Sequence, residues 1–142
     1  MERIKINLPD NFKFSTIIKI RITDLNYGGH VGNDSFLSLI HEARMQFLNS
    51  LGYSELTLEG TSLIMFDAAI EFKSELNYGD EVKISVAANG FNTRGFDIFY
   101  KLEIIHGNEY KVAAKAKTGM LCYDYTNKKL TGLPQKVKEA LI

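Results

Sequence analysis

The sequence predicts an α+β fold, in which an antiparallel sheet of about five strands wraps around one long central helix. Several stretches alternate apolar and polar residues with the period of two that half-buried strands show. One stretch repeats apolar residues at steps of three and four, as a helix does. The order along the chain is one strand, one helix and then a run of strands. That order is typical of an antiparallel sheet packed around a helix.

The first strand and the helix lie on either side of a glycine-rich segment. From Phe12 to Ile22 the apolar side chains share one parity, while lysines and an arginine take the other. The helix is predicted over Asn33 to Leu51, where extra leucines widen the apolar stripe, so we expect it to be largely enclosed. Asn33 or Asp34 can cap its start, and Gly52 can end it in a left-handed conformation. The apolar stripe consists of Phe36, Ile40, Ala43, Phe47 and Leu51.

Four further strands and a short helix follow. In the first of these strands, we expect the apolar residues at even positions from Ile64 to Phe72 to share the buried face, with Asp67 on the opposite parity. Turn residues at 106–108 and 126–128 separate the later elements. The strands are predicted over Leu63 to Glu75, Glu81 to Asn89, Gly95 to Ile105 and Tyr110 to Tyr125, and the helix over Gln135 to Leu141.

The composition indicates one globular domain, residues 1–142, with 45% apolar and 24% charged residues. The 17 basic and 17 acidic side chains cancel, so no overall field favours nucleic acid or an anionic membrane as a partner. The single cysteine, Cys122, is expected to be a buried small apolar residue, and a disulfide framework is excluded. The first ten residues are too charged for a signal peptide, and no apolar run approaches the roughly 18 residues of a membrane span. We therefore expect a soluble, cytoplasmic protein.

Residues 24–34, DLNYGGHVGND, contain three glycines, a histidine, two asparagines and two aspartates, which is more than a chain reversal needs. With the helix that follows, this segment resembles the first strand, loop and central helix of hotdog-fold thioesterases, especially the hydroxybenzoyl-CoA thioesterase-like branch. Later segments resemble the same family, so the likeness extends over most of the chain. The matching residues are Gly29-His30-Val31, Asn33, Glu42-Ala43-Arg44, Tyr78 to Val82 and Ala114 to Tyr125.

The resemblance implies a hotdog fold and the hydrolysis of an acyl-CoA or aryl-CoA thioester. Coenzyme A then belongs to the substrate, and no cofactor is implied. The resemblance also implies a homo-oligomer, a dimer or tetramer, with active sites between subunits. Pairing between subunits would in addition protect exposed strand edges.

In such an enzyme, the loop would stabilise the negative charge that develops on the thioester carbonyl oxygen. Backbone N–H groups near Gly32 and Asn33, at the helix N-terminus, are donors suited to that charge. Gly28, Gly29 and Gly32 would let the backbone approach the substrate, and Asp34 in the first turn would lie beside it. A simpler structural explanation is that the glycines permit a tight turn and that Asn33 caps the helix.

The match fails at the family's usual catalytic carboxylate, whose position is occupied by Asn26. An amide cannot take a proton from water at neutral pH. In plant acyl-carrier-protein thioesterases the comparable loop reads Asp-x-Asn-x-His, and only the histidine, His30, is retained. We expect His30 with an acidic partner to be the base, because imidazole titrates near neutral pH, and Asn26 to be an orienting group. The acidic candidates are Glu42, Asp67, Glu75, Asp24 and Asp34.

Each candidate also has a structural explanation. His30 could bond the loop backbone, and Glu42, on a helix expected to be enclosed, could pair with Arg44 or a polar loop group. Glu75 and Asp67 could simply be solvated. If the face that carries Asp67 meets a second subunit, its carboxylate could instead reach the partner's loop.

Other motifs narrow the class of protein. No metal site is implied, because His30 and His41 have no ligand triplet near them and no HExxH spacing. The glycine motifs of nucleotide-binding folds and the Gly-x-Ser-x-Gly of serine hydrolases are absent. Some cations could meet coenzyme A phosphates or be surface charges only. These cations are Lys73, Lys83, Arg94, Lys115 and Lys117.

Two alternative functions remain beside thioester hydrolysis. A non-catalytic acyl-thioester-binding protein would explain the asparagine at position 26. A hotdog dehydratase or hydratase is the other class, but its Gly-x-Pro-rich loop and its Asn-x-x-His signature are missing from the chain. Substrate that binds without turning over would distinguish a binding protein from a hydrolase.

Overall fold

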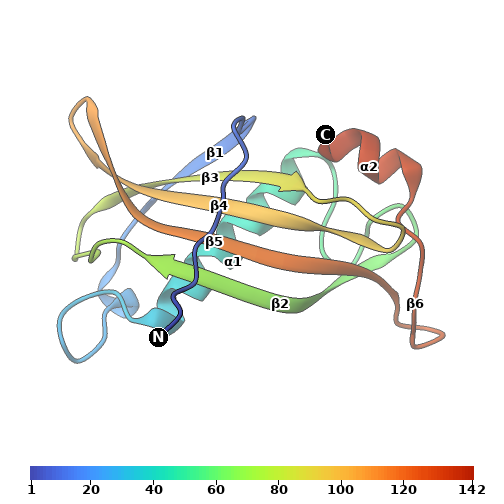
Figure 1. Cartoon of the computed structure of the whole chain (residues 1–142), viewed down its shortest axis with the longest axis horizontal. Helices are drawn as coiled ribbons and strands as arrows, with labels where there is room; N and C mark the ends of the chain where they lie inside the picture. The colour runs from blue at the N-terminus through green and yellow to red at the C-terminus, as the bar shows by residue number, and fades with distance from the viewer.

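The computed structural model describes residues 1–142, and the elements follow the predicted order, with bounds within three residues of those expected (Figure 1). A single turn of 3-10 helix, η1, and the short strand β6 were not anticipated. The short second helix, α2, was predicted with the bounds it has, so the long helix α1 is not the only helix of the fold. The elements are β1 Phe14–Lys19, η1 Ile22–Asp24, α1 Asn33–Ser50, β2 Ser62–Phe72, β3 Glu81–Asn89, β4 Gly95–His106, β5 Glu109–Asp124, β6 Lys129–Leu130 and α2 Gln135–Leu141.

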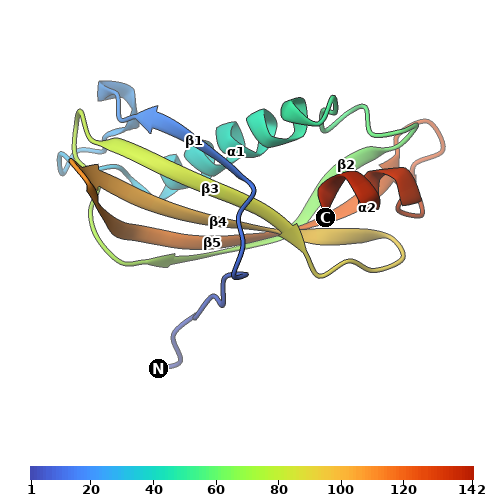
Figure 2. The ribbon, with the colours of Figure 1, turned by 90° about the horizontal axis from the view of Figure 1, so that it is seen from above.

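The sheet is antiparallel throughout, with the strand order β1-β3-β4-β5-β2 and with β6 paired to β5. It curves around α1, which lies along one face, while the N-terminal segment lies on the other (Figure 2). This arrangement confirms the predicted α+β class. Both β1 and β2 are edge strands, so each leaves one side of its backbone unpaired.

One hydrophobic cluster of 26 buried residues fills the space between α1 and the sheet and extends to α2. Alternate residues of β4, such as Ile98 and Leu102, point into this core and are fully buried. The C-terminal end of α1 is closed by Gly52, which takes the predicted left-handed conformation, with φ 81°. No helix is both long enough and apolar enough to cross a membrane.

A buried charge lies between α1 and the sheet. Arg44 is only 4% exposed, and it donates to the Glu55 carboxylate (Nε to Oε1, 2.9 Å) and to the Tyr100 hydroxyl (3.1 Å). Tyr100 in turn lies 2.8 Å from the Thr118 hydroxyl of β5. Burial opposes the charge on Arg44, but Tyr100 and Glu55 outweigh it and raise the arginine pKa above its ordinary value. This network fixes α1 against the central strands, because a buried charge is tolerated only with such partners.

Strand β2 departs from the predicted alternation. Its register against β5 shifts between Met65 and Asp67, which places Phe66 in a bulge. Phe66, in the bulge, is 55% exposed, and Phe72, at the end of this edge strand, is 49% exposed, although we expected both on the buried face. The bulge changes the parity of the strand at its middle, so one alternating pattern cannot describe both halves.

Cys122 offers a first test of the packing. Its side chain is fully buried in β5, and burial raises its pKa to about 11, so almost no thiolate forms at pH 8. A thiol reagent such as dithionitrobenzoate should leave the native protein unmodified and should modify one thiol per chain after denaturation. Rapid modification of the native protein would contradict this packing.

Gly95 tests the contact between β4 and β5. A methyl group at this position would overlap the backbone carbonyl oxygen of Met120, which cannot move without disturbing the sheet. Gly95→Ala should therefore lower the free energy of unfolding by about 2–3 kcal/mol in a denaturant titration. The matched control is Gly132→Ala, where the nearest atom lies at 3.7 Å, and it should change stability by less than about 0.5 kcal/mol. Equal effects of the two changes would contradict the strand register.

Candidate functional site

The loop before α1 closes on itself. The Asn26 N–H donates to the His30 carbonyl oxygen (2.8 Å), and the Gly29 N–H donates to the Asn26 carbonyl oxygen (3.1 Å). The Asn26 side-chain oxygen accepts from the Gly28 N–H at 2.8 Å. Gly29 has φ 82°, a conformation that favours glycine. The loop is therefore a small, internally bonded turn, and the Asn26 side-chain oxygen helps to hold it.

His30 has two polar partners from the segment that follows β2. Its Nδ1 lies 2.9 Å from the Asn77 side-chain oxygen, and its Nε2 lies 3.4 Å from Glu75 Oε2. An amide oxygen only accepts, so Nδ1 carries a hydrogen and the neutral ring has its lone pair on Nε2. A proton taken up there would face the Glu75 carboxylate. Of the acidic candidates, Glu75 is therefore the one that lies beside His30.

The start of α1 carries unpaired donors. The N-cap residue is Gly32, and no side chain caps the helix, so the prediction that Asn33 or Asp34 does so is wrong. The Gly32 N–H donates weakly to the Asp24 carbonyl oxygen at 3.4 Å. The N–H groups of Asn33, Asp34 and Ser35 have no acceptor in the chain. These three amides, at the positive end of the helix dipole, are free to bind an oxygen that carries negative charge.

Gly32 allows two side chains to approach this helix start. A methyl group on Gly32 would lie 2.6 Å from Asp34 Oδ1 and 3.7 Å from the Asn26 side-chain nitrogen. The Asn26 nitrogen has no hydrogen-bond acceptor of its own. Asn26 therefore presents a free N–H donor beside the first turn of α1, as an orienting group would.

A cavity of about 380 Å³ lies at the same place. Its walls come from the beginning of α1 and from the end of β2 with the residues after it. The rings of Phe36 and Phe72 pack edge to face, with their centroids 5.1 Å apart, and form its apolar part. Glu75 is both a wall of this cavity and the partner of His30. The lining residues are Val31, Asn33, Phe36, Phe72, Lys73, Ser74 and Glu75.

Asp24 has a structural role in this chain. Its side chain is buried, and it accepts from the Arg21 backbone N–H (2.8 Å) and from the Arg21 guanidinium (3.5 Å). The carboxylate thus holds the turn between β1 and the loop. Asp24 does not line the cavity described above.

Glu42 is exposed, so the expectation that it lies on an enclosed face of the helix is wrong. The buried side of α1 is carried by other positions, including Ala43 and Arg44, and Arg44 pairs with Glu55. Glu42 lies nine residues after the start of α1, which is roughly 14 Å along the helix axis. Its own chain therefore does not bring this carboxylate to His30.

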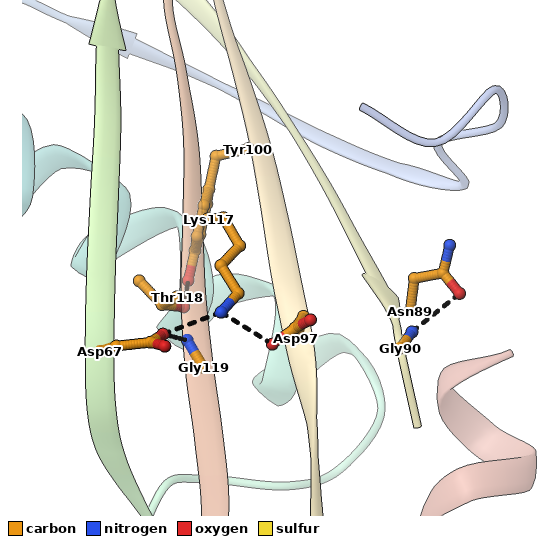
Figure 3. A network of polar contacts seen from close by, with 8 residues as sticks. All are labelled: Asp67, Asn89, Gly90, Asp97, Tyr100, Lys117, Thr118 and Gly119. Carbon is orange, nitrogen blue, oxygen red and sulfur yellow. Dashed lines mark hydrogen bonds and ion pairs between the residues drawn. The ribbon is translucent and has the colours of Figure 1, made fainter. Parts of the chain in front are cut away.

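Asp67 lies on the face of the sheet opposite α1 (Figure 3). Its Oδ1 accepts from Lys117 Nζ and from the Gly119 backbone N–H, both at 2.9 Å. Lys117 also reaches Asp97 at 3.1 Å, and although burial lowers the lysine pKa, the two carboxylates raise it above its ordinary value. Asp67 thus belongs to a network within the outer face, and the chain does not bring it to His30.

Sequence reasoning missed Asn77 and undervalued Glu75, which we took to be solvated near a strand end. The Glu75 side chain is indeed 71% exposed, yet it faces His30. Asn77 is separated from His30 by 47 positions, and no spacing pattern links them. The one available signal is the turn from Asn77 to Asp80, whose side chain accepts from the Asn77 N–H at 2.8 Å.

The assembled residues can support one type of chemistry. An imidazole that is held by an amide oxygen at one nitrogen and lies beside a carboxylate at the other can accept and return a proton. Unpaired amides at the helix start can stabilise an oxyanion, and the apolar cavity can hold an acyl or aryl group beside them. These are the parts that hydrolysis of a carbonyl compound requires.

Comparison with solved structures supports the fold. A thioesterase superfamily protein from Jannaschia sp. superposes with a TM-score of 0.82 at 15% identity, covering 94% of this chain and 83% of its own. A 1,4-dihydroxy-2-naphthoyl-CoA thioesterase from Synechocystis gives 0.76 at 22% identity, covering 90% and 94%. A 4-hydroxybenzoyl CoA thioesterase mutant, complexed with 4-hydroxybenzoyl CoA, gives 0.81 at 13% identity, covering 91% and 98%.

Among curated protein sequences no match is found. The sequence model of the thioesterase-like superfamily, in contrast, matches residues 20–141, which is well over half of the chain. The matched region includes the loop, α1 and every strand after β1. The protein therefore belongs to the thioesterase-like superfamily, with the hotdog fold of its structural neighbours.

Proposed function

We propose that this protein hydrolyses an acyl-CoA or aryl-CoA thioester. The observation that carries the proposal is that three features lie together: His30 paired with Glu75, the unpaired amides at the start of α1, and a cavity lined by both Glu75 and Asn33. The thioesterase family supports the reaction type. The apolar part of the cavity, with Phe36 and Phe72, suits an acyl or aryl group.

The proposed reaction uses His30 as the base. Its Nε2 takes a proton from water as the water oxygen bonds to the thioester carbon, and the carbonyl electrons move onto oxygen. The backbone amides of Asn33, Asp34 and Ser35 stabilise that oxyanion. The Asn26 side-chain N–H orients the thioester or the water. Collapse of the intermediate breaks the C–S bond, and His30 returns its proton to the leaving thiolate. Glu75 stabilises the imidazolium between the two steps.

We further propose that the working form is a homodimer or tetramer that pairs through β2. This strand of 11 residues has an open edge, and Met65, Phe66 and Phe72 on it are exposed. A long apolar edge of this kind favours pairing with a second copy. Neither Glu42 nor Asp67 reaches His30 of its own chain. Either carboxylate could therefore act in catalysis only at the site of the partner subunit.

A protein that binds thioesters without hydrolysing them is the second candidate. It is favoured by Asn26, which stands where the family's usual carboxylate would be. The 4-hydroxybenzoyl CoA thioesterase neighbour is an aspartate-to-asparagine mutant in complex with 4-hydroxybenzoyl CoA. The pairing of His30 with Glu75 favours hydrolysis over binding alone, because it supplies a base at a position other than 26.

Substitution of His30 tests the proposed base. His30→Ala should lower kcat for thioester hydrolysis by about 10²–10⁴-fold, because the variant lacks the nitrogen that takes the proton from water. The readout is steady-state release of free thiol. His106→Ala is the matched control: this exposed histidine at the end of β4 has no polar partner, and its loss should leave kcat unchanged. A His30→Ala variant with full kcat would remove His30 from the mechanism.

Asn26→Asp tests whether Asn26 orients the substrate or simply occupies the position at which the family's usual carboxylate acts as the base. An aspartate keeps the oxygen that bonds Gly28 but loses the free N–H, and it adds a negative charge beside the amides that bind the oxyanion. With His30 as the base, we expect kcat to fall about tenfold, which corresponds to about 1.4 kcal/mol of lost transition-state stabilisation. A kcat well above that of the unmodified protein would mean instead that position 26 is the proper place of the base.

A further inference from the structure

The N-terminal segment forms a strap across the outer face of the sheet. From the start of β1 it runs over β3, β4 and β5 toward the end of β2, on the side opposite α1, and its first residues then point away from the sheet (Figures 1 and 2). Ile6 attaches the strap: its side chain is 8% exposed, although it is not part of the 26-residue core, and its N–H donates to Glu71 Oε1 at 3.1 Å. The strap is thus held at a defined place without contributing to the main core.

The attachment point is next to the candidate site. Residues Glu2 to Lys5 and Ile70–Lys73 enclose a groove of about 570 Å³. Phe72 and Lys73 line this groove and also line the thioester cavity. The end of β2 therefore separates two hollows, one beside the start of α1 and one beneath the strap.

The groove carries free positive charge. Arg3 and Lys5 are exposed and form no ion pair with the rest of the chain. Of the two acids in the groove, Glu71 is already bound to Lys73 (2.8 Å) and to the Ile6 N–H, which together lower its pKa. Glu2 is the other acid. Two unpaired cations against one unpaired carboxylate leave a site suited to an anion.

We infer that the strap is an anion-binding arm, in which Arg3 and Lys5 contact the phosphates of a coenzyme A thioester. The inference rests on the proposed function, because it places the thioester in the cavity of Phe36 and Glu75. The phosphate-bearing portion then crosses the end of β2 at Phe72 and Lys73 and enters the groove. Guanidinium and ammonium groups suit this role, since the first binds phosphate oxygens in a fork and the second acts as a point charge.

The kinetic test reverses the charges of Arg3 and Lys5 and compares two substrates. One is a coenzyme A thioester, and the other is the N-acetylcysteamine thioester of the same acyl group, which has no phosphate. The Arg3→Glu, Lys5→Glu double variant should raise KM for the coenzyme A thioester by about three- to tenfold, with kcat unchanged. KM for the phosphate-free substrate should not change. The effect should shrink as salt concentration rises, because exposed charges are screened.

Two further variants distinguish phosphate binding by the strap from the effect of reversing any surface charge. Lys128→Glu reverses an exposed cation in the turn between β5 and β6, at the end of the sheet far from the strap, and should change neither KM (Figure 1). Ile6→Ser weakens the attachment of the strap without opening the core, and should reproduce the selective rise in KM while lowering the melting temperature only slightly. An equal rise in KM for both substrates would overturn the proposed arm.

Calorimetric binding of free coenzyme A and of phosphate-free pantetheine separates this inference from the proposed function. If the double variant binds coenzyme A about three- to tenfold more weakly but binds pantetheine equally, the arm is supported even in a protein that hydrolyses nothing. If unmodified and variant proteins bind coenzyme A equally, the arm is contradicted, whatever the hydrolytic activity.

Discussion

The burial of one face of α1 against the concave side of the sheet is the interaction on which the other features depend. Phe36, Ile40 and Phe47 supply the apolar contact, and Arg44 adds a paired charge that reaches β4 through Tyr100. Because this packing fixes the axis of α1, it also fixes where the helix begins. The loop that ends at Gly32 must deliver the chain to that point, and His30 is placed by the same constraint. The proposed chemistry therefore lies at the end of a rigid element.

Three segments far apart in the sequence meet at this end of the molecule. The loop before α1 provides His30, the residues after β2 provide Glu75 and Asn77, and the N-terminal strap brings cations to the other side of β2. The start of α1 has a glycine cap, which stabilises a helix roughly a few tenths of a kcal/mol less than a side-chain cap does. That small cost leaves three amides available for a ligand. The site thus retains unpaired donors on a helix that the core holds in place.

The sequence was sufficient for elements whose periodicity is local. The helix, the bounds of β3 and the glycine at the end of α1 follow from patterns within a few residues. It was insufficient where tertiary contacts decide. The bulge at Phe66 changes the parity of β2, and the exposure of Glu42 depends on which side of α1 the sheet covers. His30 was identified from the loop and its family resemblance, but Glu75 and Asn77 meet it only because the chain folds back, and no sequence spacing records that contact.

The most direct measurement is steady-state release of free thiol by the unmodified protein from a panel of short-chain, long-chain, hydroxybenzoyl and phenylacetyl coenzyme A thioesters. The buried Cys122 thiol should not contribute to the signal, because it does not ionise at the pH of such an assay. A hydrolase built on His30 and Glu75 should turn over at least one of these substrates many times per chain. Saturable binding across the panel with no thiol released would contradict the proposed reaction and would identify the cavity as a thioester-binding site only.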